Sequence, residues 1–181
     1  MASITLSEQD LSDRRNSLHS MFAPLRGEKP RVALGFATDS PRGTRALVVT
    51  DEKTAGLRYR EESFRTSVAA LRCRYYELWR TRPGGNLALY RAYFTVVEVV
   101  PTTTEFPQLL GVHTDPTDND DLKQGPHLHV FRAPQPIPHC HFPLDYGFLQ
   151  TVLEDCDSLT AAMRRAIAVV ARDVLPRFKD R

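Results

Sequence analysis

The chain has 181 residues, of which 41% are hydrophobic and 25% are charged, and its formal net charge is +2 at pH 7. These totals are typical of one folded domain, and so small a net charge does not by itself indicate nucleic-acid binding. No apolar run approaches the roughly 18 residues that span a bilayer, and the N-terminal residues lack the apolar core of a secretory signal. Because the three cysteines show no disulfide spacing, we expect a cytoplasmic protein.

The first part of the chain is predicted to form an N-terminal helical arm, residues 1–26, ahead of a single domain, residues 27–181. Residues 7–22 carry apolar side chains at helical spacing, and Ser7 with Asp10 matches a capping box at the start of this helix. A proline- and glycine-containing segment follows and is expected to end the helix.

Strands are predicted to dominate the middle of the chain. Residues 57–81 fit both a helical stripe and strand alternation, and we interpret them as helix to about residue 68 followed by a strand. A proline- and glycine-rich turn after that strand predicts a hairpin with the next one. The predicted strands are Val32–Ala37, Ala46–Thr50, residues 70–81, Leu87–Val100, Phe106–His113, His127–Arg132 and His139–Phe142.

The C-terminal part is predicted to be helical. One helix is expected at about Tyr146–Cys156, and a second begins near Asp157 or Ser158 and ends at Pro176. The fold class that follows is α+β: an antiparallel sheet of about five to seven strands, with the C-terminal helices packed on one face and an N-terminal helix.

Five of the six histidines fall within 29 residues, and four of them form two His-x-His pairs in the predicted hairpin 126–143. Residues i and i+2 of a strand point to the same face. An antiparallel register in which paired residue numbers have an even sum therefore keeps all four imidazoles on one face. A sum of 268, for example, sets His127 opposite His141 and His129 opposite His139. We expect an even register, because an odd one would turn one imidazole pair toward the core. The residues expected behind the imidazoles are Leu128, Val130, Cys140 and Phe142.

Several kinds of chemistry remain open for this histidine face. It is a catalytic or substrate-binding face, a noncatalytic metal or structural site, or plain surface polarity. A divalent metal such as Zn, Ni or Fe would be held by His113, Asp115, His127 and His129, since imidazole and carboxylate are ligands for such ions. A cupin-like metal enzyme is a third interpretation, although no Glu follows at the spacing that cupins use. Zinc-finger cysteine pairs, a phosphate-binding loop and a dinucleotide-binding glycine motif are absent from the sequence.

Residues 106–156 run from a strand through an acidic loop to Pro-His-Leu-His-Val and a helix. This segment resembles the small TumE-like toxins of prokaryotic toxin–antitoxin modules. The matching positions are Asp115, Asp118, Asn119, Pro126, His127, His129 and Val130. The resemblance implies a toxin-like or defence-associated protein that cleaves RNA, with an antitoxin or a defence-complex subunit as its protein partner.

RNA cleavage without a metal needs one neutral imidazole as base, one protonated imidazole as acid and a cation on the phosphate. The candidates for the acid and base are His127, His129, His139 and His141. Arg91 and Arg132 are the candidate phosphate ligands, and Tyr93 is a candidate to stack on a base. The plainer interpretation of Tyr93 is cross-strand packing. No membrane contact is expected.

Overall fold

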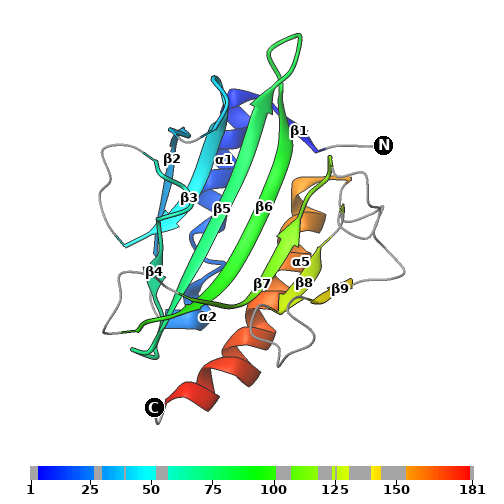
Figure 1. The fold of residues 1–181 in the computed structure, drawn as a ribbon. Coiled ribbons are helices and arrows are strands. Elements are labelled where there is room, and N and C mark those ends of the chain that lie inside the picture. The colour runs from blue at the N-terminus through cyan, green and yellow to red at the C-terminus, as the bar shows by residue number, and fades with distance from the viewer. Residues whose placement is uncertain are drawn as a thin grey trace.

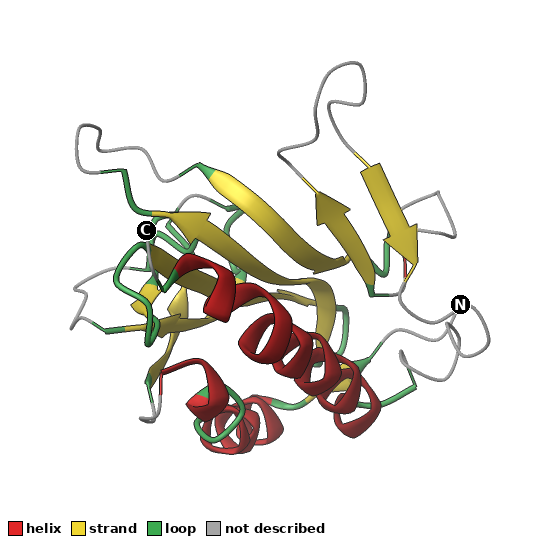
Figure 2. Ribbon diagram, turned by 90° about the horizontal axis from the view of Figure 1, so that it is seen from below, coloured by secondary structure: helices red, strands yellow, loops and turns green. Residues whose placement is uncertain are grey.

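Figures 1 and 2 show one twisted antiparallel sheet with helices packed on one of its faces. The structure, a computed structural model, describes residues 4–26, 30–38, 40–51, 57–100, 107–117, 124, 126–130, 140–143 and 154–179. Over this part of the chain the α+β prediction is confirmed. None of the helices described there is both long and apolar enough to cross a bilayer.

The sheet has nine strands among the described residues, seven of them on the main path β2-β3-β5-β6-β7-β8-β9. Short β1 pairs with β6, and short β4 pairs with β5. The bounds are β1 Thr5–Leu6, β2 Arg31–Phe36, β3 Arg45–Thr50, β4 Phe64–Arg65, β5 Leu71–Thr81, β6 Leu87–Glu98, β7 Gln108–Thr114, β8 His127–Val130 and β9 Cys140–Pro143. The predicted strands are all present, shifted by a few residues at their ends.

The N-terminal segment begins with the predicted capping box. The Asp10 N–H donates to Ser7 Oγ and the Ser7 N–H donates to Asp10 Oδ2, each at 3.1 Å. The helix predicted over residues 7–22 is α1 (Glu8–Leu18) and ends earlier than expected, because residues 19–22 form turns. A short second helix, α2 (Ala23–Arg26), begins in the proline-containing segment that was expected to be non-helical. The apolar side chains of this N-terminal segment belong to the same hydrophobic core as the sheet, so the predicted arm packs within the domain. The fully buried members are Leu11, Leu18, Phe22 and Leu25.

The prediction of a helix up to residue 68 is wrong. Among the described residues 57–68 the backbone forms turns and β4, which places Phe64 opposite Cys73 of β5. The physical reason is that this segment serves two faces of the sheet. Phe64 lies in the main core, whereas Tyr59 packs on the opposite face against Tyr76. One helix presents a single apolar stripe and could not fill both places.

The C-terminal helix α5 (Cys156–Val169) starts slightly before the predicted position, because Asp155 is its N-cap and accepts the Ser158 N–H at 2.7 Å. Pro176 does not end the helical structure, contrary to the prediction. A π-helical turn at Val170–Val174 leads into a 3-10 helix, Leu175–Phe178, with the proline in its first turn. Proline is tolerated in the first turn of a helix, because the N–H group that it lacks would have no partner within the helix there. Most of the helix predicted at residues 146–156 lies outside the described residues.

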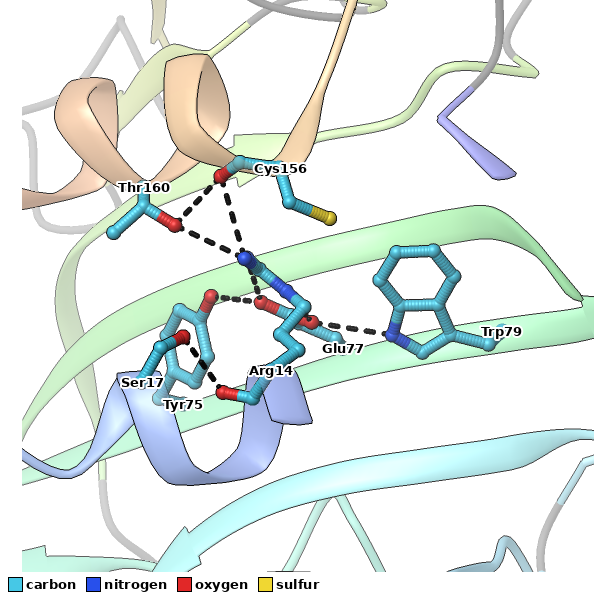
Figure 3. Close-up of polar contacts among 7 residues, drawn as sticks. All are labelled: Arg14, Ser17, Tyr75, Glu77, Trp79, Cys156 and Thr160. Carbon is cyan, nitrogen blue, oxygen red and sulfur yellow. Dashed lines mark hydrogen bonds and ion pairs between the residues drawn. The ribbon is translucent and has the colours of Figure 1, made fainter. Parts of the chain in front are cut away.

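A buried polar network ties the two helices to the sheet (Figure 3). Arg14 of α1 donates to both carboxylate oxygens of Glu77 on β5, at 2.7 and 2.6 Å, and these side chains are 3% and 0% exposed. Arg14 also donates to Thr160 Oγ1 at 3.0 Å and to the Cys156 carbonyl at 3.3 Å, both on α5. One guanidinium therefore bridges the N-terminal helix, the sheet and the C-terminal helix.

Glu77 accepts further hydrogen bonds from its own strand. The Tyr75 hydroxyl donates to Oε1, and the Trp79 indole N–H donates to Oε2 at 3.1 Å. Burial opposes the charge on Arg14, but the carboxylate outweighs burial and raises the arginine pKa. Burial, reinforced by the nearby Glu77 charge, raises the pKa of Tyr75. At neutral pH the network is thus an ion pair with neutral donors around it.

Candidate metal centre and adjoining pocket

Three histidines meet on the sheet face that lies opposite the helices. β7 and β8 pair so that His113 stands opposite His127, and His129 lies two residues further along β8 on the same face. Alternation puts Val112 and Leu128 on the other face, where they pack against the main core. The expected arrangement of imidazoles in front and apolar residues behind is confirmed for this part of β8.

The three imidazoles are almost completely buried, with 8%, 0% and 6% of His113, His127 and His129 exposed. One ring nitrogen from each can be chosen so that all three lie within 4.8 Å of one another. The residue opposite His129 is Gly111, which has no side chain, and the His129 ring instead approaches that of His113, with the centroids 3.9 Å apart. His127 meets His113 edge-on at 6.1 Å.

The second His-x-His pair lies in an even register, as predicted, but not in the one given as the example. β8 pairs with β9 so that His129 is opposite His141 and His127 is opposite Pro143, a sum of 270 rather than 268. Alternation alone cannot separate two registers that differ by two residues, because both put the same side chains on the same face. His141 is thus at a position on the histidine face, while His139 and Arg132 lie outside the described residues.

Tyr93 on β6 covers one side of this cluster. Its ring lies parallel to that of His113, with the centroids 3.8 Å apart, and its hydroxyl donates to the Asp115 carboxylate at 2.6 and 2.8 Å. Arg91 Nε lies 3.1 Å from the same carboxylate. Burial and then the hydrogen bond to Asp115 raise the pKa of Tyr93, which keeps the phenol protonated. The ring packs across strands, which is the plainer of the two predicted roles.

Asp115 was predicted as a metal ligand together with the three histidines. The group that converges in the described part of the chain consists of His113, His127 and His129. The Asp115 carboxylate is placed against Tyr93 and Arg91, beside this group. Its contacts there are those of a residue that orients its neighbours.

A pocket of about 270 Å³ opens next to the histidines on the same face. Its lining includes Arg60, Arg74, Tyr76, Arg91, Tyr93 and His113. The sequence pointed to Arg91 and Tyr93 but not to Arg60 or Arg74. The phase of β5 carried a signal for Arg74, because it alternates with the core residues Cys73 and Tyr75 and so must face the other way.

The donor set fits a divalent transition metal. Imidazole nitrogens bind zinc at about 2.0–2.1 Å, so two of them on one tetrahedral ion lie roughly 3.3 Å apart. The three ring nitrogens, within 4.8 Å of one another, would have to move only a little closer together to reach that spacing. No protein-family model, curated protein or solved structure matches the chain. The geometry of the site therefore guides the functional proposal.

Proposed function

We propose that the chain is a metal-dependent hydrolase that cleaves phosphodiester bonds, with RNA as its substrate. The observation that carries this proposal is that one ring nitrogen from each of His113, His127 and His129 lies within 4.8 Å of the other two, and that all three residues are almost completely buried. Three protein ligands that leave a further position for water or substrate are typical of catalytic zinc. Structural zinc sites more often use four protein ligands, with cysteines among them.

The spacing favours a metal over a metal-free acid and base. Attack at phosphorus sets the attacking and leaving oxygens roughly in line, so a base and an acid must stand on opposite sides of the phosphate. The ring nitrogens that lie within 4.8 Å of one another are too close together to make two hydrogen bonds of about 2.8 Å on opposite sides of one phosphate, so a metal-free mechanism would have to use other nitrogens. The space between the three imidazoles suits an ion, which makes His127 and His129 ligands in this proposal.

The chemistry that an ion supplies here is activation of water. An ion of this kind, held by His113, His127 and His129, would lower the pKa of a bound water to about 7, close to neutral pH. Hydrolysis would join the oxygen of that water to phosphorus and break the bond from phosphorus to the leaving oxygen, which would take up the proton that the water releases. Tyr93 and Asp115 hold His113 and Arg91 in place beside the reacting group.

The resemblance to TumE-like toxins supports RNA as the substrate and adds a biological setting. It favours a cytoplasmic toxin or defence effector that is controlled by a protein partner. A noncatalytic metal site in an interaction protein is the competing function, and burial of the three imidazoles is compatible with it. Activity separates the two.

Metal analysis of the purified full chain is the first test. We expect about one equivalent of Zn, Ni or Fe in the wild-type protein, lost in His127→Ala and in His129→Gln. His19→Ala is the matched control, because His19 follows α1 and contacts the Pro30 carbonyl, outside the cluster. Circular dichroism establishes that each variant is folded. Wild-type protein that binds none of these metals when they are supplied would overturn the metal centre.

Cleavage of a labelled single-stranded RNA is the second test. We expect cleavage by the metal-loaded protein, loss of cleavage after chelation and recovery when the metal is returned. Cleavage that persists in chelator and is lost in His129→Gln would instead establish the metal-free mechanism. A loaded protein that cleaves neither RNA nor a simple phosphodiester, yet binds a partner stably, would replace the enzyme proposal with the interaction protein.

A further inference from the structure

The pocket beside the histidines is lined on several sides by arginine. Arg74 comes from β5, Arg91 from β6 and Arg60 from the segment before β4, and His113 forms the side next to the metal centre. Among the described residues that line the pocket, none carries a carboxylate. Three cations thus face a small cavity, and the Asp115 carboxylate beside it is paired with Arg91 and Tyr93.

Two of the three arginines, Arg91 and Arg60, are held in position by contacts with residues that do not line the cavity. Arg91 is paired with Asp115, and its guanidinium carbon lies 4.8 Å from the centre of the Tyr90 ring. The Arg60 guanidinium donates to the Tyr59 hydroxyl at 3.1 Å and lies over the Tyr59 ring at 5.5 Å. Tyr59 in turn packs on Tyr76, with ring centroids 4.7 Å apart. Such anchoring lowers the entropy that ordering costs when a ligand binds.

Arg74 and Arg91 differ in their electrostatic surroundings, because the pKa of Arg74 is lowered whereas that of Arg91 is raised. Burial lowers the pKa of Arg74, and the charge of Arg72 lowers it further, while Tyr76 and Glu61 act in the opposite direction. A guanidinium that has lost much of its water is stabilised by an anion able to accept two parallel hydrogen bonds. Phosphate and carboxylate both offer that geometry, and arginine is most used where phosphate is recognised.

We propose that this pocket binds a phosphate group of the RNA substrate, the one adjacent to the bond that is cut. Its volume of about 270 Å³ lies just below the usual range of small-molecule sites, which suits a phosphate with its sugar. Because His113 belongs both to the pocket and to the metal cluster, the bound phosphate lies next to the metal centre. The identity of the substrate rests on the proposed function, whereas phosphate binding by the arginines does not.

The test uses the full chain after dialysis against chelator, so that binding is measured without the metal. Inorganic phosphate is titrated by calorimetry, and a labelled hexauridylate is titrated by fluorescence anisotropy. Arg74→Gln and Arg91→Gln are compared with Arg164→Gln. Arg164 is exposed on α5, which packs on the opposite face of the sheet, so its loss removes the same charge elsewhere.

We expect Arg74→Gln and Arg91→Gln to weaken hexauridylate binding about tenfold or more, the usual effect of losing a charge-assisted hydrogen bond. The slope of log affinity against log salt should fall by about 0.7 for each phosphate contact removed. Arg164→Gln should bind as the wild type does. If Arg91→Gln disturbs Asp115 and unfolds, Arg74→Gln alone decides, because Arg74 is not among the Asp115 contacts described above.

Three results would overturn the proposal that this pocket binds phosphate. They are wild-type affinity in Arg74→Gln, an equal loss in Arg164→Gln, and competition by acetate as strong as that by phosphate, which would make it a carboxylate site. Metal content distinguishes this proposal from the proposed function. If the chain takes up no metal but binds phosphate through these arginines, the phosphate-binding proposal stands and the metal-centre proposal is refuted. If cleavage depends on metal but Arg74→Gln binds hexauridylate as the wild type does, the metal-centre proposal stands and the phosphate-binding proposal is refuted.

Discussion

Replacing Arg14 with leucine should destabilise the protein severely, because it leaves a fully buried carboxylate without its cation. Arg14 makes two hydrogen bonds to Glu77, one to Thr160 and one to the Cys156 carbonyl, and both charged side chains are almost inaccessible to water. Solvent therefore cannot take over the lost contacts. Removing one partner of a buried ion pair costs about 3–5 kcal/mol. This is a large part of the roughly 5–15 kcal/mol that stabilises a typical domain.

Urea unfolding measures this loss, and the molecule contains its own reporter. Trp79 is the one tryptophan in the sequence, is fully buried and donates to Glu77, so its fluorescence follows the network directly. The loss corresponds to a melting temperature lower by roughly 6–20 °C in a chain of this length. Arg15→Leu is the control, since the neighbouring Arg15 is only half-buried and removes the same charge from the same helix.

Two results would refute this reasoning. One is a loss in Arg14→Leu no larger than in Arg15→Leu. The other concerns the double variant Arg14→Leu/Glu77→Gln, in which no charge remains buried while the amide oxygen still accepts a hydrogen bond. It should be more stable than Arg14→Leu alone, because a buried ion pair stabilises little compared with neutral packing but is costly when broken. A double variant as unstable as the sum of the two single variants would show that the charges are not coupled.

Three further predictions concern the metal, the pH dependence and a helix cap. Zinc at about 100 times its dissociation constant should add about 2.7 kcal/mol to the free energy of unfolding, measured by calorimetry and lost in His113→Ala. Burial raises the pKa of both Tyr75 and Tyr76. Their phenols therefore contribute stability that is fully present below pH about 10 and is lost above it, by about 1.4 kcal/mol per pH unit for each tyrosine. Melting curves from pH 8 to 11 check this, and Tyr76→Phe should flatten the slope. Asp155→Ala should cost about 1 kcal/mol in urea unfolding by removing the N-cap of α5, a larger loss than in the exposed Asp157→Ala.

The histidine face could be predicted because strand alternation decides which residues of β8 lie on the same face of the sheet. Leu128 has to reach the core, which fixes the phase of β8, and the same phase turns His127 and His129 to the opposite face of the sheet, where they are also buried. The exact pairing with β9 could not be predicted, since registers that differ by two residues satisfy the same alternation. His113 was expected in the metal group from its residue type, and the register of β7 with β8 brings it beside His127.

The Arg14–Glu77 network could not be predicted from the sequence pattern. Glu77 is the one charged residue among the core-facing positions of β5, and a charge at such a position requires a buried partner. The sequence offers 20 arginines for that role, and the one that fills it lies 63 residues away on a helix whose packing could not be predicted. The segment before β4 failed for a related reason. Its apolar residues divide between two faces of the sheet, and only tertiary packing decides which goes where.

The two polar features of this protein are connected through β5, because its alternate residues serve both. Tyr75 and Glu77 point to the helices and are fixed by Arg14, whereas Arg74 and Tyr76 point to the pocket on the other face. A binding site holds its geometry best on a strand whose own position is fixed by packing and buried hydrogen bonds. The ion pair between α1 and β5 therefore supports more than the docking of the N-terminal helix. It anchors from behind the strand that presents Arg74 to the anion, so the two arginines act on opposite faces of one rigid element.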